Sequence, residues 1–206
     1  MRKVVIVFGL PGSGKGTQSK SIGARYGIPA ITTGDILREK ALQDEALRKS
    51  LAKGDYTPDE VIGEFLEEKI ESIGGCDFIF DGFPRTLSQL KTQDELEKKY
   101  GLLTLPVYIN IGPEVAINRL SARYVCDRCG LISAEPGVCS CGGHMKRRSD
   151  DHPDVIRHRL QVFEQETAPV IEVYRERGNL IIINGEGTQD AVSLRIYEKL
   201  DNYFKK

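Results

Sequence analysis

The first apolar run of the chain leads directly into a glycine-rich turn that contains one lysine. Residues 4–8 (VVIVF) are followed by GLPGSGK, residues 9–15. This stretch matches the pattern G-x-x-x-x-G-K between a strand and a helix, which is typical of a loop that binds phosphate. The glycines let successive backbone N–H groups turn toward one anion, and the next helix N-terminus and Lys15 add positive charge. An ordinary glycine turn is the alternative, and the strand and helix on either side argue against it.

Short apolar runs alternate with segments of helical spacing along the rest of the chain. The runs at 78–81, 107–111 and 180–183 are rich in β-branched and aromatic residues, as buried parallel strands are. The segments 59–73, 88–100, 113–124 and 190–204 carry apolar residues every three or four positions. This alternation predicts a doubly wound α/β sheet with helices on both faces. Residues 32–61 and 124–158 interrupt it, so we expect two small insertions in a single domain.

Length and charge limit the classes of function. The 206 residues are enough for a core without disulfides, and the net charge is −1. No basic excess indicates a nucleic-acid partner, and no stretch approaches the roughly 18 apolar residues of a membrane span. We therefore expect a cytoplasmic protein that acts without nucleic acid or membrane. We also expect a monomer, although length and charge do not determine the oligomeric state.

The glycine loop departs from the common pattern, because Gly16 follows Lys15 and the hydroxyl that could contact Mg²⁺ comes one residue later, at Thr17. The stretch G-x-P-G-S-G-K-G-T resembles the loop of nucleoside monophosphate kinases, the adenylate kinase family above all, and the resemblance runs nearly end to end. It implies a P-loop NTPase-like core with a five-stranded parallel sheet, and transfer of the γ-phosphoryl group of Mg·ATP to AMP, giving two ADP. The implied core is 1–31, 62–123 and 159–206, with an AMP-binding insertion at 32–61 and a zinc-bearing lid at 124–158.

The expected donor site combines the glycine loop with two arginines. Arg119 and Arg123 are four residues apart, which predicts that they lie on one helix face. The resemblance implies that ATP binds to Gly12, Ser13, Gly14, Lys15, Gly16, Thr17, Arg119, Arg123 and Gly187.

The expected acceptor site begins at the end of the run 78–81. Asp81 follows a strand at the edge where ligands bind in open α/β sheets, and its carboxylate could hold Mg²⁺ through water. Arg85 offers a planar fork for phosphate, and Gln89, one helical turn later, could read a base edge with its amide. The resemblance implies that AMP binds to Thr33, Arg38, Tyr56, Thr57, Gly82, Arg85, Gln89, Arg148 and Arg159.

Phosphoryl transfer needs in-line placement and positive charge around several phosphate oxygens, more than Lys15 alone can supply. The resemblance implies that the catalytic residues are Lys15, Asp81, Arg85, Arg119, Arg123, Arg148 and Arg159. We expect Asp150 and Asp151 to pair with arginines when the lid closes; the alternative is that they are solvated charges at the start of a helix. Arg147 and Arg157 have no match in the family pattern and are expected on the surface.

Four of the five cysteines lie within 16 residues, as Cys126 and Cys129 followed by Cys139 and Cys141. Two closely spaced thiolate pairs suit a tetrahedral structural Zn²⁺ site. The C-x-C spacing of the second pair is tighter than usual, so His144 could replace one of its ligands. We expect Cys76, which stands apart, to serve in packing.

Several alternatives stay open at this point. A UMP or CMP kinase would keep the fold, and Thr33 and Gln89 argue against it. GTP could replace ATP, because the donor base would mostly meet backbone near residues 187–189. A nucleotide switch or a zinc-ribbon nucleic-acid binder is a different class; the chain lacks an N-K-x-D guanine signature and a basic surplus.

Overall fold

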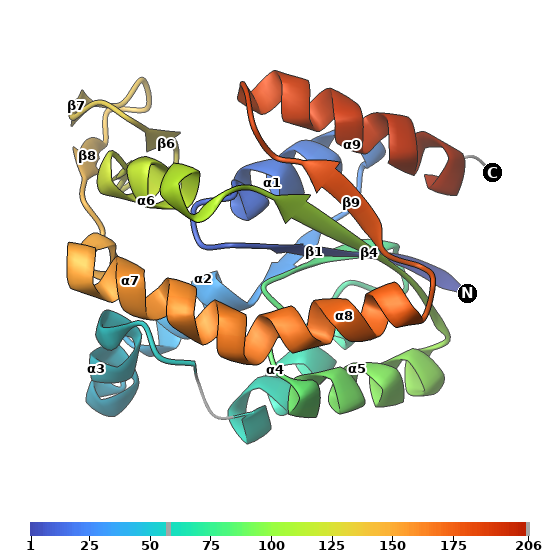
Figure 1. Ribbon diagram of the computed structural model, residues 1–206. Coiled ribbons are helices and arrows are strands. Elements are labelled where there is room, and N and C mark those ends of the chain that lie inside the picture. Colours follow the sequence, from blue (N-terminus) through green and yellow to red (C-terminus); the bar gives the residue numbers. More distant parts are fainter. Residues whose placement is uncertain (57–58, 205–206) are drawn as a thin grey trace.

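A five-stranded parallel sheet forms the centre of the computed structural model, which describes residues 1–56 and 59–204 (Figure 1). Its strands are β1 (Arg2–Gly9), β2 (Ala30–Thr32), β3 (Phe78–Asp81), β4 (Leu102–Asn110) and β9 (Ile181–Asn184), in the order β2-β3-β1-β4-β9. The predicted doubly wound sheet is confirmed. Four strands coincide with the apolar runs; the fifth, β2, has only three residues and no such run.

The central strand β1 is buried on both sides. It pairs in parallel with β3 from Val4 opposite Phe78, and with β4 from Arg2 opposite Leu102. Because successive side chains of a strand point to opposite faces, Val4 belongs to one apolar cluster and Val5 to the other. An uninterrupted apolar run is therefore what a strand covered by helices on both faces requires.

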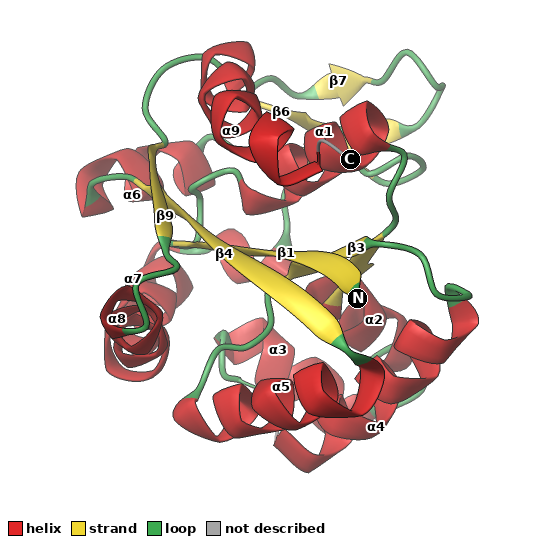
Figure 2. Cartoon of the chain, turned by 90° about the vertical axis from the view of Figure 1, so that its right-hand side faces the viewer, coloured by secondary structure: helices red, strands yellow, loops and turns green. Residues whose placement is uncertain are grey.

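Helices cover both faces of the sheet (Figure 2). One face carries α1 (Lys15–Tyr26) and α9 (Gln189–Phe204), which contribute Ile22 and Ile196 to its core. The other carries α4 (Asp59–Ser72), α5 (Leu87–Tyr100), α6 (Pro113–Ser121) and α8 (Ala168–Glu176). The helix α7 (Pro153–Val162) continues through a π-helical turn, η2 (Phe163–Thr167), into α8.

Two segments interrupt the alternation of strands and helices. Residues 33–56, here called the helical segment, contain α2 (Thr33–Lys40) and α3 (Glu45–Lys53). Residues 124–146, the cysteine segment, form a small antiparallel sheet in the order β6-β5-β8-β7. Its strands are β5 (Tyr124–Cys126), β6 (Ile132–Ser133), β7 (Gly137–Val138) and β8 (His144–Lys146), followed by the 3-10 turn η1 (Ser149–Asp151).

The described residues contain no helix that is both long enough and apolar enough to cross a membrane.

Candidate active site

The loop between β1 and α1 closes around the end of Lys15. The ammonium group of Lys15 donates hydrogen bonds to the carbonyl oxygens of Gly9, at 2.6 Å, and Leu10, at 3.0 Å. Gly12 has φ of +87°, and a Cβ there would lie 2.8 Å from the carbonyl oxygen of Ala116, so both conformation and space require glycine. The Ser13 hydroxyl is buried and has no hydrogen-bond partner among the described residues. It is the kind of polar atom that a ligand satisfies.

Several charges converge on this loop. Part of the Lys15 side chain reaches solvent, but its ammonium group lies inside the loop, and burial lowers the pKa of Lys15 to about 7. Asp81 raises that pKa, whereas Arg85, Arg159 and Arg123 lower it. Residues from three distant parts of the sequence are thus electrostatically coupled to the loop. An anion bound there would relieve the repulsion between the cations.

Asp81 lies at the carboxyl end of β3, beside the residue that follows Lys15. A Cβ on Gly16 would be 3.4 Å from Asp81 Oδ2, and Asp81 is buried. Thr17 lies in the first turn of α1. A carboxylate and a hydroxyl are oxygen ligands of the kind that Mg²⁺ prefers, so the residues next to the loop fit such an ion.

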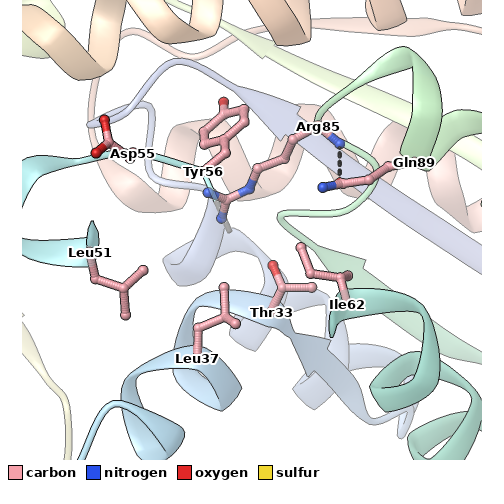
Figure 3. Close-up of a pocket in the computed structure, with 8 residues that line it drawn as sticks. All are labelled: Thr33, Leu37, Leu51, Asp55, Tyr56, Ile62, Arg85 and Gln89. Atoms are coloured by element: carbon pink, nitrogen blue, oxygen red, sulfur yellow. Dashed lines mark hydrogen bonds between the residues drawn. The ribbon is translucent and has the colours of Figure 1, made fainter. Parts of the chain in front are cut away.

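A pocket that is open to solvent lies between the helical segment and the residues that follow β3 (Figure 3). Four residues predicted to bind AMP meet there: Thr33, Tyr56, Arg85 and Gln89. The other lining residues are Leu37, Leu51, Asp55 and Ile62. The pocket therefore combines an apolar wall with a guanidinium, a phenol and a buried amide, as a site for a flat base and a phosphate would.

Hydrogen bonds hold the polar side of this pocket in place. Gln89 Oε1 accepts from the backbone N–H of Arg85 at 2.8 Å (Figure 3). Arg85 Nε and the Thr33 hydroxyl both donate to the carbonyl oxygen of Gly82, at 2.7 and 2.8 Å. The Arg85 guanidinium lies 5.2 Å from the centre of the Tyr56 ring. Arg85 precedes α5, so this backbone contact, and not a shared helix face, brings Gln89 next to Arg85.

Arg38, which is also predicted to bind AMP, does not line this pocket. Arg38 is exposed on α2, and a Cβ on Gly34 would lie 3.2 Å from its Nη1, so the guanidinium folds back over that turn. Thr57 lies outside the described residues.

Three predicted arginines converge on the two aspartates of η1. Arg123 contacts Asp151 through Nε at 2.7 Å and Nη2 at 2.5 Å. Arg148 contacts Asp150 in the same two-pronged way, at 2.8 and 2.6 Å. Arg159 Nη1 lies 3.0 Å from Asp150 Oδ2 and 3.4 Å from Asp151 Oδ1. The predicted pairing of these aspartates with arginines is present.

Asp150 keeps its negative charge although its side chain is only 14% exposed. Burial by itself raises the pKa of Asp150, but Arg148, Arg159 and Arg123 outweigh it and hold the pKa below its ordinary value. Burial lowers the pKa of Arg159 to about 10, partly offset by Asp150. Three guanidinium groups against two carboxylates leave a positive surplus beside the glycine loop.

The prediction that Arg119 and Arg123 share a helix face is wrong. Helix α6 ends at Ser121, and β5 begins at Tyr124, so the chain changes direction between the two arginines. Arg119 instead donates to the carbonyl oxygen of Gly187, at 3.4 Å, and so meets the other distant residue predicted for the donor site. Arg147 and Arg157 are exposed, as predicted.

The four clustered cysteines meet at one point. Their sulfur atoms all lie within 4.8 Å of one another, with Cys126 and Cys141 at 3.4 Å and Cys129 and Cys139 at 3.6 Å. Four thiolates around one Zn²⁺ at about 2.3 Å would be about 3.8 Å apart, which is close to these separations. The backbone N–H groups of Cys129 and Arg128 donate to Cys126 and help to lower the pKa of that thiol to about 6, which favours the thiolate that binds metal. The site can hold a metal ion.

Two further predictions concern His144 and Cys76. Among the residues that the structure describes, the metal-type cluster contains the four cysteines and not His144, which is exposed on β8. The prediction that Cys76 serves in packing is wrong, because Cys76 is exposed in the turn between α4 and β3.

Sequence reasoning missed Thr167. Its buried hydroxyl donates to the carbonyl oxygen of Arg85 at 2.9 Å and lies 2.8 Å from the Tyr56 hydroxyl. Thr167 ends the π-helical turn η2, and such turns are frequent at functional sites. The local sequence does not predict these contacts, because both partners, Arg85 and Tyr56, are more than 80 residues away along the chain.

A parallel sheet, a glycine loop that leads into α1, and several cations around its lysine define a nucleotide-binding protein of the P-loop class. The family model described as adenylate kinase matches residues 7–179. An adenylate kinase of Kosmotoga olearia is 37% identical over 212 residues, covering 96% of this chain and 99% of its own. Those of Lactobacillus delbrueckii and Archaeoglobus fulgidus are 39% and 37% identical, covering 91% and 90% of this chain and 94% and 91% of their own. The chain belongs to the adenylate kinase family, whose members are nucleoside monophosphate kinases.

Proposed function

We propose that this enzyme transfers the γ-phosphoryl group of ATP, bound with Mg²⁺, reversibly to AMP and so forms two ADP. The observation that carries the proposal is the electrostatic coupling of Lys15 in the glycine loop to Arg85, which lines a separate pocket. Two phosphate-bearing ligands that occupy the loop and the pocket would meet between these two cations.

The donor would lie against the glycine loop. In this proposal Gly12, Ser13, Gly14, Lys15, Gly16 and Thr17 hold its phosphates, and Arg119, Arg123 and Gly187 complete the site. The Lys15 ammonium would exchange its two carbonyl acceptors for phosphate oxygens and regain a stable positive charge, because the anion opposes the effect of burial on its pKa.

The acceptor would lie in the pocket of Figure 3. Thr33, Gln89, Gly82 and the backbone near Tyr56 and Thr57 would select adenine, and Arg38, Arg85, Arg148 and Arg159 would hold the phosphate. An oxygen of that phosphate attacks the γ-phosphorus, the bond to the β-bridging oxygen breaks, and ADP leaves with the electron pair. The arginines neutralise the charge on the transferring group, and a closed site excludes water, which would otherwise accept the phosphoryl group.

Thr17, and Asp81 through water, would hold the Mg²⁺ ion. The ion supplies charge neutralisation and orientation of the donor phosphates. The catalytic set in this proposal is Lys15, Asp81, Arg85, Arg119, Arg123, Arg148 and Arg159.

The two interrupting regions would be mobile parts of one domain. We assign AMP binding to an insertion at 32–61 and lid function to 124–158, on a core of 1–31, 62–123 and 159–206. Cys126, Cys129, Cys139 and Cys141 would hold a structural Zn²⁺ that supports the lid and takes no part in the chemistry. The enzyme would act in the cytoplasm as a monomer whose partners are ATP, AMP and ADP.

A coupled assay of ADP formation tests the proposal, with AMP, UMP, CMP and GMP as acceptors and ATP and GTP as donors. We expect turnover with ATP and AMP. Lys15→Met should lower kcat by about a hundredfold or more, because it removes the positive charge at the donor phosphates. Turnover confined to UMP or CMP would overturn the acceptor assignment. Normal turnover by Lys15→Met would overturn the assignment of the glycine loop as the donor site.

A further inference from the structure

Arg195 holds the loop that joins β9 to α9. The Nη1 atom of this α9 residue donates to the carbonyl oxygen of Asn184 at 2.8 Å and to that of Glu186 at 2.7 Å. One side chain therefore fixes two alternate carbonyls at the start of the loop. Charge-assisted bonds of this kind are stronger than neutral ones.

Arg119 holds the carbonyls that lie between those two. Its Nη2 atom donates to Gly185 O at 3.1 Å and to Gly187 O at 3.4 Å. The two arginines come from α6 and α9, helices that pack on opposite faces of the sheet. Four successive carbonyls are thus held alternately from two sides.

The rest of the loop is also tightly placed. The buried side chain of Gln18, on α1, donates to the carbonyl oxygen of Gln189 at 3.0 Å and accepts from the Ser193 hydroxyl at 2.8 Å. A Cβ on Gly185 would lie 2.6 Å from Ile109 Cγ2, so the backbone lies directly on β4. The loop has little freedom to shift as long as these contacts persist.

We propose that Arg195 is a positioning residue that makes this loop select the base of the phosphoryl donor. The inference rests on the proposed function, in which Arg119 and Gly187 belong to the donor site. When Arg119 turns to the donor, the carbonyls of Gly185 and Gly187 lose their donor, while Arg195 still holds the loop by Asn184 and Glu186.

The released carbonyls distinguish purines by the group at carbon 6. The 6-amino group of adenine donates a hydrogen bond to a carbonyl, whereas the 6-oxo group of guanine or hypoxanthine is itself an acceptor. A carbonyl held in place therefore faces an unpaired acceptor when a 6-oxo base binds, and this costs affinity. A loop that can move would shift its carbonyl away from the 6-oxo group and avoid that cost. Because Arg195 holds the loop in place, the selection against 6-oxo bases depends on Arg195.

Arg195→Gln tests the inference, with ATP and ITP as donors at saturating AMP. ITP carries a 6-oxo group beside an N1–H where ATP has a 6-amino group beside an unprotonated N1. We expect the KM for ATP to rise about fivefold to tenfold, and the preference for ATP over ITP in kcat/KM to fall by a similar factor, with the KM for AMP unchanged. Arg195→Lys should restore part of both effects, because an ammonium can donate to the same carbonyls. Arg175→Gln, the same change at an exposed site on α8, should alter neither.

The outcomes separate the two proposals. Absence of AMP-dependent turnover in the unaltered enzyme would overturn the proposed function and this inference with it. An active enzyme whose Arg195→Gln variant keeps its donor KM and its preference for ATP would overturn the inference alone. So would equal rises in the KM values for ATP and AMP, which would indicate general loosening. If Arg195→Gln does not fold, Arg195→Lys carries the same comparison, and unchanged donor kinetics would overturn the inference.

Discussion

The helical segment and the cysteine segment both interrupt the βα alternation, but they keep their shapes by different means. The helical segment buries Leu37 and Ala41. In the cysteine segment the only buried apolar side chains, within the described residues, are Cys126 and Cys139, whereas Leu131 and Val138 are 52% and 70% exposed. Strands of two or three residues cannot bury a core of their own, so the four thiols take its place.

The difference shows how small insertions on a large sheet can be stabilised separately. The helical segment depends on apolar contact with the core helices. The cysteine segment depends on a single thiol cluster that a chelator or a cysteine substitution can disrupt. Each can therefore be disrupted without the other.

Loss of the metal ion that we propose for the four cysteines should have the largest effect. Structural zinc sites supply about 10 kcal/mol or more of apparent binding energy in small domains. We therefore expect Cys126→Ser, or treatment with a strong chelator, to remove hydrogen-exchange protection from residues 124–146 and leave residues 33–56 protected. Cys76→Ser, at the exposed cysteine, is the matched control and should change neither. Full protection of residues 124–146 after verified metal removal would show that the thiol cluster is not what stabilises the cysteine segment.

Leu37→Ala should be the next largest change, and it acts on the other segment. A buried leucine that lines the proposed acceptor pocket loses contacts on truncation, so we expect a loss of about 3 kcal/mol in the free energy of unfolding. The KM for AMP should rise, and the response to a chelator should stay the same. Urea denaturation measures the first effect and the coupled assay the second.

Leu42→Ala, in the same segment but 79% exposed, is the control and should cost less than about 0.5 kcal/mol. Equal losses from the two leucines would show that burial is not what holds the helical segment.

Asp150→Asn should have a smaller effect that depends on pH, at the junction between the cysteine segment and α7. Despite burial, its arginine partners hold the pKa of Asp150 below the ordinary value of 3.8 in the folded state. As the pH falls, the unfolded chain therefore binds the proton first. The stabilisation is present above about pH 4 and disappears as the pH falls through the lower folded-state pKa.

We expect Asp150→Asn to lose about 1 to 2 kcal/mol at pH 7, and the difference from the unaltered protein to shrink toward pH 3. Urea unfolding at the two pH values measures it. Asp154→Asn, whose partner Arg157 is exposed, should behave like the unaltered protein. A difference that stays constant with pH would exclude the charge as the cause.

The smallest effect concerns the start of α3. The Asp44 carboxylate caps this helix by accepting from the Leu47 N–H at 3.0 Å, so Asp44→Ala should cost about 1 kcal/mol. Gln43→Ala, at the exposed neighbouring position, should cost almost nothing. Thermal unfolding of the two variants measures the difference, and equal melting temperatures would argue against the cap.

Predictions from sequence succeeded where neighbouring residues suffice. The apolar runs located four strands, and the paired cysteines met despite the tight C-x-C spacing, because two short turns bring them together. Predictions failed where they depended on the residue at which a helix ends or on whether a side chain is buried. The helical pattern of 113–124 did not reveal that α6 ends at Ser121, and an isolated Cys76 carried no sign of its exposure.

The sequence by itself determined the glycine loop, the alternation of strands and helices and the cysteine cluster, because each depends on residues close together in the chain. Only the tertiary structure decided the partners of the charged and polar side chains. Arg123 meets Asp151, Thr167 meets Arg85, and Arg195 holds Asn184 because helices from separate parts of the chain pack around one sheet. Contacts of that kind depend on how distant elements fit together, and no local pattern records that.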